Sequence, residues 1–242
     1  MANVLNYHRP ESLDAALALL QRAHPTLVLG GGSHLVPSLR GDPSDVVDLQ
    51  SLGLRGICED GPLLALGAMS TFADLAACTL LPEGVRELAR REAPSTLRTL
   101  ATVGGLVASG DADSELLAAF LVMGASVTIA AVDGRRTSPL AVVLESGTAR
   151  TEIIVAVTVD PSMIVLSART VRTGMDRAIV AVVGSLSPDG AIRLAVTGAA
   201  ESPVVFSDPS VLNPPSDFRG TTNYRLQLVS VLSTRVRKAL GS

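Results

Sequence analysis

The 242-residue chain has few of the residues that build several common kinds of site. It has no tryptophan, and aromatic residues make up only 2% of it, which excludes the stacked aromatic platforms that bind single-stranded nucleic acid. Lys238 is the only lysine and the formal net charge is −3, so the strongly basic face of a nucleic-acid-binding protein is not expected. Two cysteines, Cys58 and Cys78, are too few for an iron–sulfur or zinc site by themselves. We interpret them as free thiols in a reducing cytoplasm.

Segments that would direct the chain into or across a membrane are also not predicted. The N-terminal sequence has no charged region followed by an apolar region, so we expect no signal peptide. The uncharged stretch from Leu116 to Val132 is at the short limit for a span, which needs about 20 apolar residues. Its first half is typical of a helix and its second half is rich in β-branched residues. A buried helix followed by a buried strand is therefore expected, and we predict a cytoplasmic protein.

What is abundant is apolar sequence, at 47% of the chain, which is enough for a large core. Residues 1–52 are predicted to form a small unit of strands and a helix that Ser12 caps. Residues 53–160 continue with paired strands and with a helix that Thr71 caps, and residues 96–116 are interpreted as a long polar loop. Residues 161–242 are predicted to form mainly strands and a final helix, with a hairpin turn at Ser187–Gly190.

Three consecutive glycines, Gly30 to Gly32, follow the apolar run Thr26–Leu29. Backbone N–H groups can converge on an anion where no Cβ blocks the approach, and a tight turn is the other explanation. The spacing differs from the dinucleotide-binding fingerprint, and the lysine of a phosphate-binding Walker A loop is absent. The glycines alone leave both explanations open.

A second loop repeats the pattern, with Thr102 before Gly104 and Gly105. Two such loops from one domain could hold the two ends of a long ligand. Side chains added at Gly31 or Gly104 are expected to fill the space where backbone meets ligand. Five polar residues follow, and a carboxylate among them could hold a ribose, although acidic residues are also typical of a solvated helix N-terminus. These residues are Ser109, Asp111, Asp113, Ser114 and Glu115.

Six stretches resemble, in order, the motifs of one family: YHRPESLDAALALL, GGGSHLVPSLR, VVDL, LALGAMSTFADL, TLRTLATVGG and SDFRGTTNYRLQLVSVL. That family is the flavin-binding medium subunit of the molybdenum hydroxylases, which include carbon monoxide dehydrogenase and xanthine dehydrogenase. The matches extend over nearly the whole chain. The resemblance implies an α+β fold in which two α/β subdomains (1–52 and 53–160) clasp FAD. A small antiparallel sheet domain with helices (161–242) follows.

The resemblance also implies which residues contact FAD. The first glycine loop would hold the pyrophosphate and comprises Val28, Leu29, Gly30, Gly31, Gly32, Ser33, His34 and Leu35. The second clamp would comprise Thr102, Val103, Gly104, Gly105 and Leu106. Glu115 would lie near the ribose, Ile154 would line the flavin pocket, and Arg169 would lie beside the flavin. No catalytic side chain and no metal ligand is predicted.

The implied role is electron transfer within a hetero-oligomer. Iron–sulfur clusters of a small partner subunit would pass electrons from a molybdopterin-containing large subunit to FAD, and FAD would pass them to an external acceptor. Three departures from the family pattern bear on FAD binding, namely Leu106 for asparagine, Glu115 for aspartate and Leu117 for proline. They leave two alternatives open, an FAD-free paralogue that acts as a scaffold or assembly protein and a stand-alone flavin reductase.

Overall fold

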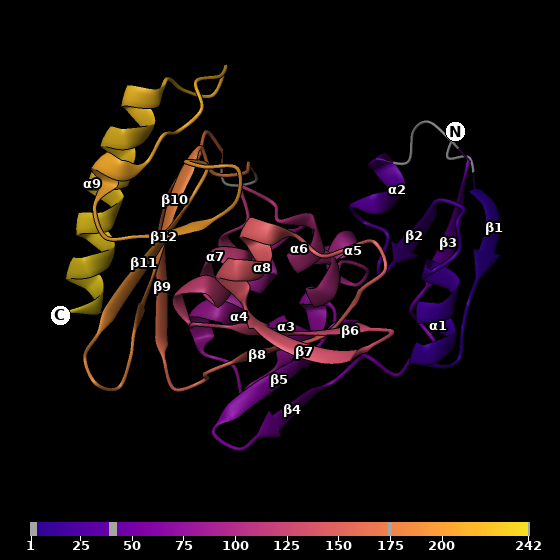
Figure 1. Ribbon diagram of the computed structural model, residues 1–242. Coiled ribbons are helices and arrows are strands. Elements are labelled where there is room, and N and C mark those ends of the chain that lie inside the picture. The colour runs from indigo at the N-terminus through magenta and orange to yellow at the C-terminus, as the bar shows by residue number, and fades with distance from the viewer. Residues whose placement is uncertain (1–3, 39–42, 174–175, 242) are drawn as a thin grey trace.

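The computed structural model describes residues 4–38, 43–173 and 176–241, and Figure 1 shows three sheets that succeed one another along the chain. The first sheet, at the N-terminal end, is parallel with strand order β1-β3-β2. Helix α1 (Leu13–Leu20) covers it, and Ser12 caps this helix by accepting a hydrogen bond from the Ala15 N–H, as predicted. The strands of this sheet are β1 (Val4–His8), β2 (Thr26–Leu29) and β3 (Ser44–Asp48). The short helix α2 (Leu35–Ser38) follows the first glycine loop.

The second sheet is antiparallel with strand order β4-β5-β8-β6-β7, and its helices occupy most of the centre of the molecule (Figure 1). The predicted capping box at the start of α3 is confirmed, since Thr71 and Asp74 bond each other's backbone N–H. The strands are β4 (Ile57–Asp60), β5 (Leu63–Gly67), β6 (Ser126–Ala131), β7 (Gly134–Pro139) and β8 (Ile153–Val159). The helices are α3 (Phe72–Ala77), α4 (Glu83–Glu92), α5 (Ser95–Arg98), α6 (Val103–Ser109), α7 (Glu115–Val122) and α8 (Leu140–Ser146).

The segment interpreted as a long polar loop, residues 96–116, is instead largely helical. It contains most of α5, all of α6 and the first two residues of α7. Glycine is unfavourable inside a helix by about 1 kcal/mol relative to alanine, which is why the glycine pair argued against one. Thr102 caps α6, and the close packing of Gly104 on Ala68 described below requires glycine at that position. Tertiary packing therefore overrides the local preference.

The third sheet is antiparallel with strand order β12-β11-β10-β9, and α9 lies along one of its faces (Figure 1). Helices α4 and α7 pack on the same sheet from the side of the central helices. The predicted hairpin at Ser187–Gly190 connects β10 to β11. The elements of this part are β9 (Ile164–Thr170), β10 (Val180–Leu186), β11 (Ile192–Thr197), β12 (Val204–Phe206), the 3₁₀ turn η1 (Pro209–Val211) and α9 (Thr222–Leu240).

The uncharged stretch from residue 116 to 132 is buried within this arrangement. It forms α7 followed by β6, as the change in residue type predicts, and every residue of α7 is buried. In the part of the chain that the structure describes, no helix has the length and apolar character needed to cross a membrane. Cys58 and Cys78 are free thiols.

Candidate functional site

Two adjoining hollows lie between the first sheet and the central helices, with volumes of about 330 and 480 Å³. Both are lined by the end of β2, by the first glycine loop and by the start of α6, so they form one continuous cleft. Most of the predicted site residues lie on its walls. These are Val28, Gly30, Gly31, Gly32, Ser33, His34, Leu35, Thr102, Gly104, Gly105, Leu106 and Ile154.

The first glycine loop offers backbone donors to this cleft. The N–H groups of Gly30, Gly31, Gly32 and Ser33 donate no hydrogen bond within the residues that the structure describes. Gly32 has a φ of +72°, a conformation that glycine adopts without strain. Successive N–H groups at a left-handed residue form a concave site for an anion, because several partial positive charges point the same way. The loop can therefore hold phosphate oxygens.

The second glycine segment has its backbone donors already in use. The N–H of Val103 bonds the Ser70 carbonyl oxygen at 2.9 Å, and that of Gly104 bonds the Ala68 carbonyl oxygen at 2.8 Å. The N–H of Gly105 bonds the Thr102 hydroxyl at 3.2 Å. These three N–H groups are therefore not available to a ligand as those of the first loop are, and the clamp expected at Thr102–Leu106 stays a prediction. The segment forms a wall of the cleft.

Glycine lets each segment pack closely on a neighbouring part of the fold, the first loop on Leu100 and α6 on Ala68. A Cβ at Gly31 would lie 1.5 Å from the Leu100 carbonyl oxygen, and a Cβ at Gly104 would lie 2.9 Å from the Cβ of Ala68. The space at these two positions is filled by the protein's own atoms, which corrects the expectation that a ligand occupies it. At Gly105 the only near atom is the Thr102 hydroxyl oxygen at 3.0 Å, and Gly105 is exposed to the cleft.

The smaller hollow ends against apolar side chains and one charged pair. Leu49, Met69 and Ile154 contribute apolar surface, and Ile154 lies on β8 as a wall residue. Glu152, also on this wall, pairs with Arg136 at 3.0 Å. Apolar surface with a small number of polar groups is typical of pockets that bind small molecules and cofactors.

Four predicted site residues are not brought to the cleft walls: Leu29, Val103, Glu115 and Arg169. The Glu115 carboxylate is buried and accepts a hydrogen bond from Arg91 at 2.7 Å. It also accepts one from Arg169 at 3.4 Å. The structure thus brings Glu115 and Arg169 together as an ion pair between α7 and β9.

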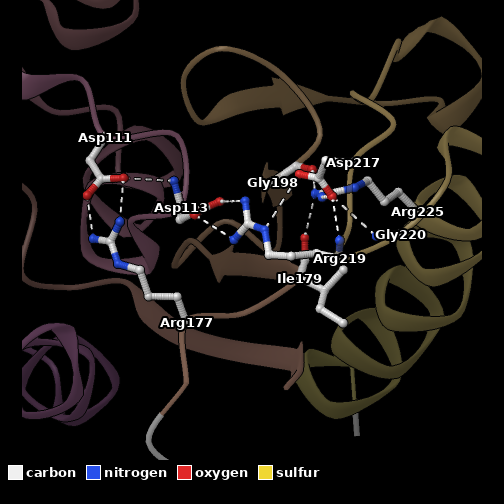
Figure 2. Close-up of polar contacts among 9 residues, drawn as sticks. All are labelled: Asp111, Asp113, Arg177, Ile179, Gly198, Asp217, Arg219, Gly220 and Arg225. Atoms are coloured by element: carbon white, nitrogen blue, oxygen red, sulfur yellow. Dashed lines mark hydrogen bonds and ion pairs between the residues drawn. The ribbon is translucent and has the colours of Figure 1, made fainter. Parts of the chain in front are cut away.

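The sequence did not indicate one residue of the cleft wall, Arg177, which lies in the segment that connects two strands of the third sheet. Arg177, between β9 and β10, lines the larger hollow, and its Nη1 donates to Asp111 Oδ1 at 2.9 Å. A second bond joins Arg177 Nη2 to Asp111 Oδ2 (Figure 2). Burial acts to raise the pKa of Asp111, but the bonds from Arg177 outweigh it and hold this pKa below its usual value. No motif marks Arg177, because its partner lies 66 residues earlier.

Further arginines fix the same acidic segment to the C-terminal part (Figure 2). Arg219 Nη1 donates to Asp113 Oδ2 at 2.7 Å. Between the two aspartates, the Ala112 carbonyl oxygen accepts a bond of 2.9 Å from the Gly198 N–H. The segment that follows α6 is therefore held by side chains and backbone of residues 177–219.

Arg225, at the start of α9, anchors this assembly. Its side chain is fully buried, and its Nη1 donates to the carbonyl oxygens of Ile179 at 3.0 Å and Gly198 at 2.6 Å (Figure 2). Its Nη2 donates to Asp217 at 2.6 Å, and this bond holds the pKa of Asp217 at about 2. A buried charge is tolerated only with such partners.

The cleft therefore combines a cradle of backbone donors with an apolar end, which fits an elongated ligand that carries phosphate groups and a ring. The model of the family described as "FAD binding domain in molybdopterin dehydrogenase" matches residues 3–162. The chain belongs to this family. The cofactor of this domain is FAD, and the site residues fit it, since its pyrophosphate is an anion and its ring systems are planar.

Curated relatives and solved structures agree with this membership. The chain is 32% identical over 139 residues to the carbon monoxide dehydrogenase medium chain of Afipia carboxidovorans, an alignment that covers 54% of this chain and 48% of that one. It spans about half the length of that relative. It is 24% identical over 277 residues to the glyceraldehyde dehydrogenase medium chain of Sulfolobus acidocaldarius, covering 98% of each.

A solved structure shares the whole fold. Carbon monoxide dehydrogenase from Hydrogenophaga pseudoflava, in a form that lacks the Mo-pyranopterin moiety of the molybdenum cofactor, superposes with a TM-score of 0.91. The sequence identity is 23%, and the superposition covers 99% of this chain and 98% of that chain. The predicted combination of helices and antiparallel sheets with an FAD-binding fold is thereby confirmed.

Proposed function

We propose that this chain is the FAD-carrying medium subunit of a molybdenum hydroxylase-type oxidoreductase. In this role it receives electrons from the iron–sulfur clusters of a small partner subunit, which draws them from a molybdopterin-containing large subunit. The FAD then delivers them to an external acceptor. The observation that carries the proposal is the cradle of four backbone N–H groups, Gly30 to Ser33, which have no partner among the described residues and lie in a cleft of this family's domain.

The roles of the residues follow from what each offers to the cleft. The N–H groups of Gly30 to Ser33 hold the pyrophosphate, and Gly105 leaves room for it to pass the start of α6. Ile154 and Met69 pack against a ring system and exclude water. The bound isoalloxazine supplies the redox chemistry, and the protein supplies binding, orientation and electrostatics. Arg177 closes the larger hollow from the C-terminal part.

The first experiment is an absorbance spectrum of the purified chain, followed by release and quantification of any FAD. We expect flavin bands and close to one FAD per chain. The absence of FAD binding, even after addition of FAD to the folded apoprotein, would overturn the proposal and favour the scaffold or assembly role. Oxidation of NADH by the isolated chain would instead favour a stand-alone flavin reductase.

A second experiment separates the cradle from the rest of the cleft. The apoprotein is titrated with FAD, ADP and riboflavin, of which only the first two carry a pyrophosphate. We expect FAD and ADP to compete with each other and riboflavin to bind at least about tenfold more weakly than FAD, a difference of about 1.4 kcal/mol. Equal affinities for riboflavin and FAD would show that Gly30 to Ser33 do not bind the pyrophosphate, although the chain would still be a flavoprotein.

The partner subunits are tested with the tagged chain expressed in its native host. We expect the purified complex to contain subunits that carry iron and molybdenum, measured by elemental analysis. A chain that carries FAD but purifies without either metal would overturn the electron-transfer proposal.

A further inference from the structure

The larger hollow contains a carboxyl group that no role assigned above uses. Glu92, the last residue of α4, lies on its wall together with Gly31, Gly32 and Ser33 of the first glycine loop. Its Oε2 accepts a hydrogen bond of 3.1 Å from the Leu116 N–H, in the first turn of α7. The cradle for an anion and a carboxyl group therefore share one wall of one cleft.

The charged groups around Glu92 come from several elements, and their effects on the Glu92 carboxylate oppose one another. Arg177, from the connection between β9 and β10, attracts the Glu92 carboxylate, whereas Asp111, from the segment after α6, repels it. The guanidinium of Arg177 already makes two hydrogen bonds with Asp111. His34, from the first glycine loop, lines the same hollow.

Two further arginines, Arg98 and Arg91, lie near Glu92. Arg98, on α5, donates to the carbonyl oxygen of Ala93, the residue after Glu92, at 3.1 Å. Arg91 directs its guanidinium to Glu115 and to the Ser167 hydroxyl. Among the residues that the structure describes, no salt bridge to Glu92 is formed. An ionised Glu92 would therefore place a poorly compensated negative charge beside the cradle.

Burial raises the pKa of Glu92 to about 7, against the opposing effects of hydrogen bonds from Ser114 and Leu116 and of the positive charge on Arg177. The carboxyl group therefore exchanges its proton in the neutral range. A negative charge brought into the same cleft raises this pKa further, because it disfavours the ionised form. Binding of an anion and protonation of Glu92 consequently favour each other.

We propose that Glu92 sets the affinity of the cleft for its anionic ligand, and that binding of the FAD pyrophosphate draws a proton onto the Glu92 carboxyl. This inference rests on the proposed function for the identity of the ligand. The sign follows from linkage. The protein binds the anion most tightly when Glu92 is protonated. The affinity starts to fall as the pH rises through the pKa of Glu92 in the free protein. It stops falling once the pH is above the higher pKa of Glu92 in the complex.

The test measures the Kd of FAD for the apoprotein at about pH 6, 7 and 8.5. We expect binding about tenfold weaker at the highest pH than at the lowest, which corresponds to a shift of about one pKa unit between free and bound protein. Calorimetry near neutral pH, in two buffers of different ionisation enthalpy, should show proton uptake on binding. This second readout needs no variant.

The matched variants are Glu92→Gln and Glu87→Gln. Both remove one carboxylate from α4, but Glu87 is exposed and lies outside the cleft walls. We expect Glu92→Gln to bind FAD equally well across the pH range, with the affinity that the wild type shows at low pH. Glu87→Gln should keep the wild-type dependence.

Each contrary outcome is informative. If FAD binds with the same Kd at every pH and without proton uptake, the inference is wrong and the proposed function stands. A pH dependence that survives in Glu92→Gln assigns the proton to another group and also overturns the inference. If FAD does not bind at all, the proposed function fails, and the same series with inorganic pyrophosphate decides the role of Glu92. Pyrophosphate binding that is absent or pH-independent overturns that role.

Discussion

The two glycine segments look alike in sequence but differ in what their backbones do. In the first, Gly30 to Ser33 keep their N–H groups directed to no partner within the described residues, and the chain turns without forming a helix. In the second, Thr102 caps α6 and the N–H groups of residues 103–105 are bonded to the protein. The first segment offers backbone donors to the cleft, and the second packs its helix closely against Ala68.

The glycines of each segment also differ among themselves. Gly31 and Gly104 have protein atoms where a side chain would be, so their smallness serves the packing of the fold. At Gly105 a Cβ would meet a single side-chain atom, the Thr102 hydroxyl oxygen at 3.0 Å, and the residue lines the cleft, so a substitution there tests the ligand side of the motif. A glycine-rich motif therefore combines structural and ligand-binding requirements at neighbouring positions, and substitutions can separate them.

The largest effect is expected from Gly31→Ala. Its Cβ would lie 1.5 Å from the carbonyl oxygen of Leu100, a backbone atom that no change of rotamer can move away. We expect a loss of about 3 kcal/mol in the free energy of unfolding, since overpacking against backbone forces the first glycine loop away from Leu100. Urea unfolding followed by circular dichroism measures this. Wild-type stability would show that the first glycine loop does not contact Leu100.

A smaller loss of stability is expected from Gly104→Ala, whose Cβ would lie 2.9 Å from the Cβ of Ala68 and 3.0 Å from its carbonyl oxygen. The clash costs about 1–3 kcal/mol, and the helix preference of alanine returns up to about 1 kcal/mol. A net loss of about 1–2 kcal/mol in the free energy of unfolding is expected. An increase in stability would contradict the close contact between α6 and Ala68.

The neighbouring Gly105→Ala should separate stability from binding. Within α6 the change favours the helix by up to about 1 kcal/mol, so the thermal midpoint should stay or rise. The added methyl group projects toward the cleft, and we expect FAD to bind about tenfold more weakly, a loss of about 1.4 kcal/mol. Gly104→Ala serves as the control, with the opposite balance of effects. Unchanged FAD affinity would show that no ligand passes this position.

The smallest effect is expected from the acidic segment that follows α6, whose carboxylates pair with arginines, whereas Gly30 to Gly32 of the first loop offer only backbone groups. The folded-state pKa of Asp111 is lowered, so its contribution to stability is present above the unfolded value and is lost as the pH falls through the folded one. At most about 1 kcal/mol is involved, because Arg177 is partly exposed. Asp111→Asn should flatten the loss of unfolding free energy below about pH 4. Asp133→Asn, at an exposed position, is the control and should leave this loss unchanged. If the two variants gave the same pH dependence of the free energy of unfolding, the Arg177–Asp111 pair would not contribute to stability.

Local signals predicted the regular elements well, and long-range contacts explain where they did not. Ser12 and Thr71 mark helix starts through side chains that act within three residues, and both caps are present. The α6 helix was missed because its stability depends on contacts with Ala68 and Ser70, more than thirty positions before its end. Local preference cannot report such contacts.

The candidate site was predictable in part for the same reason. Three consecutive glycines were enough to indicate a tight turn or an anion-binding loop at Gly30 to Gly32. The resemblance to a flavin-binding family then indicated FAD as the ligand. Nothing in the sequence around Gly31 indicates that this residue packs against Leu100. Arg177 and Glu92 also stand in no motif, and they reach the cleft only because β9, α4 and α7 pack together.

The Arg219–Asp113 pair joins residues that are 106 positions apart. During synthesis at about 5–20 residues per second, the acidic segment emerges roughly 5–20 s before the arginine that fixes it has been made. Through that interval Asp113 is an unpartnered carboxylate beside a nascent apolar core. The contacts that residues 177–225 make with the acidic segment are thus a late step of biogenesis, and Arg177 reaches the cleft wall only after most of the chain has been translated.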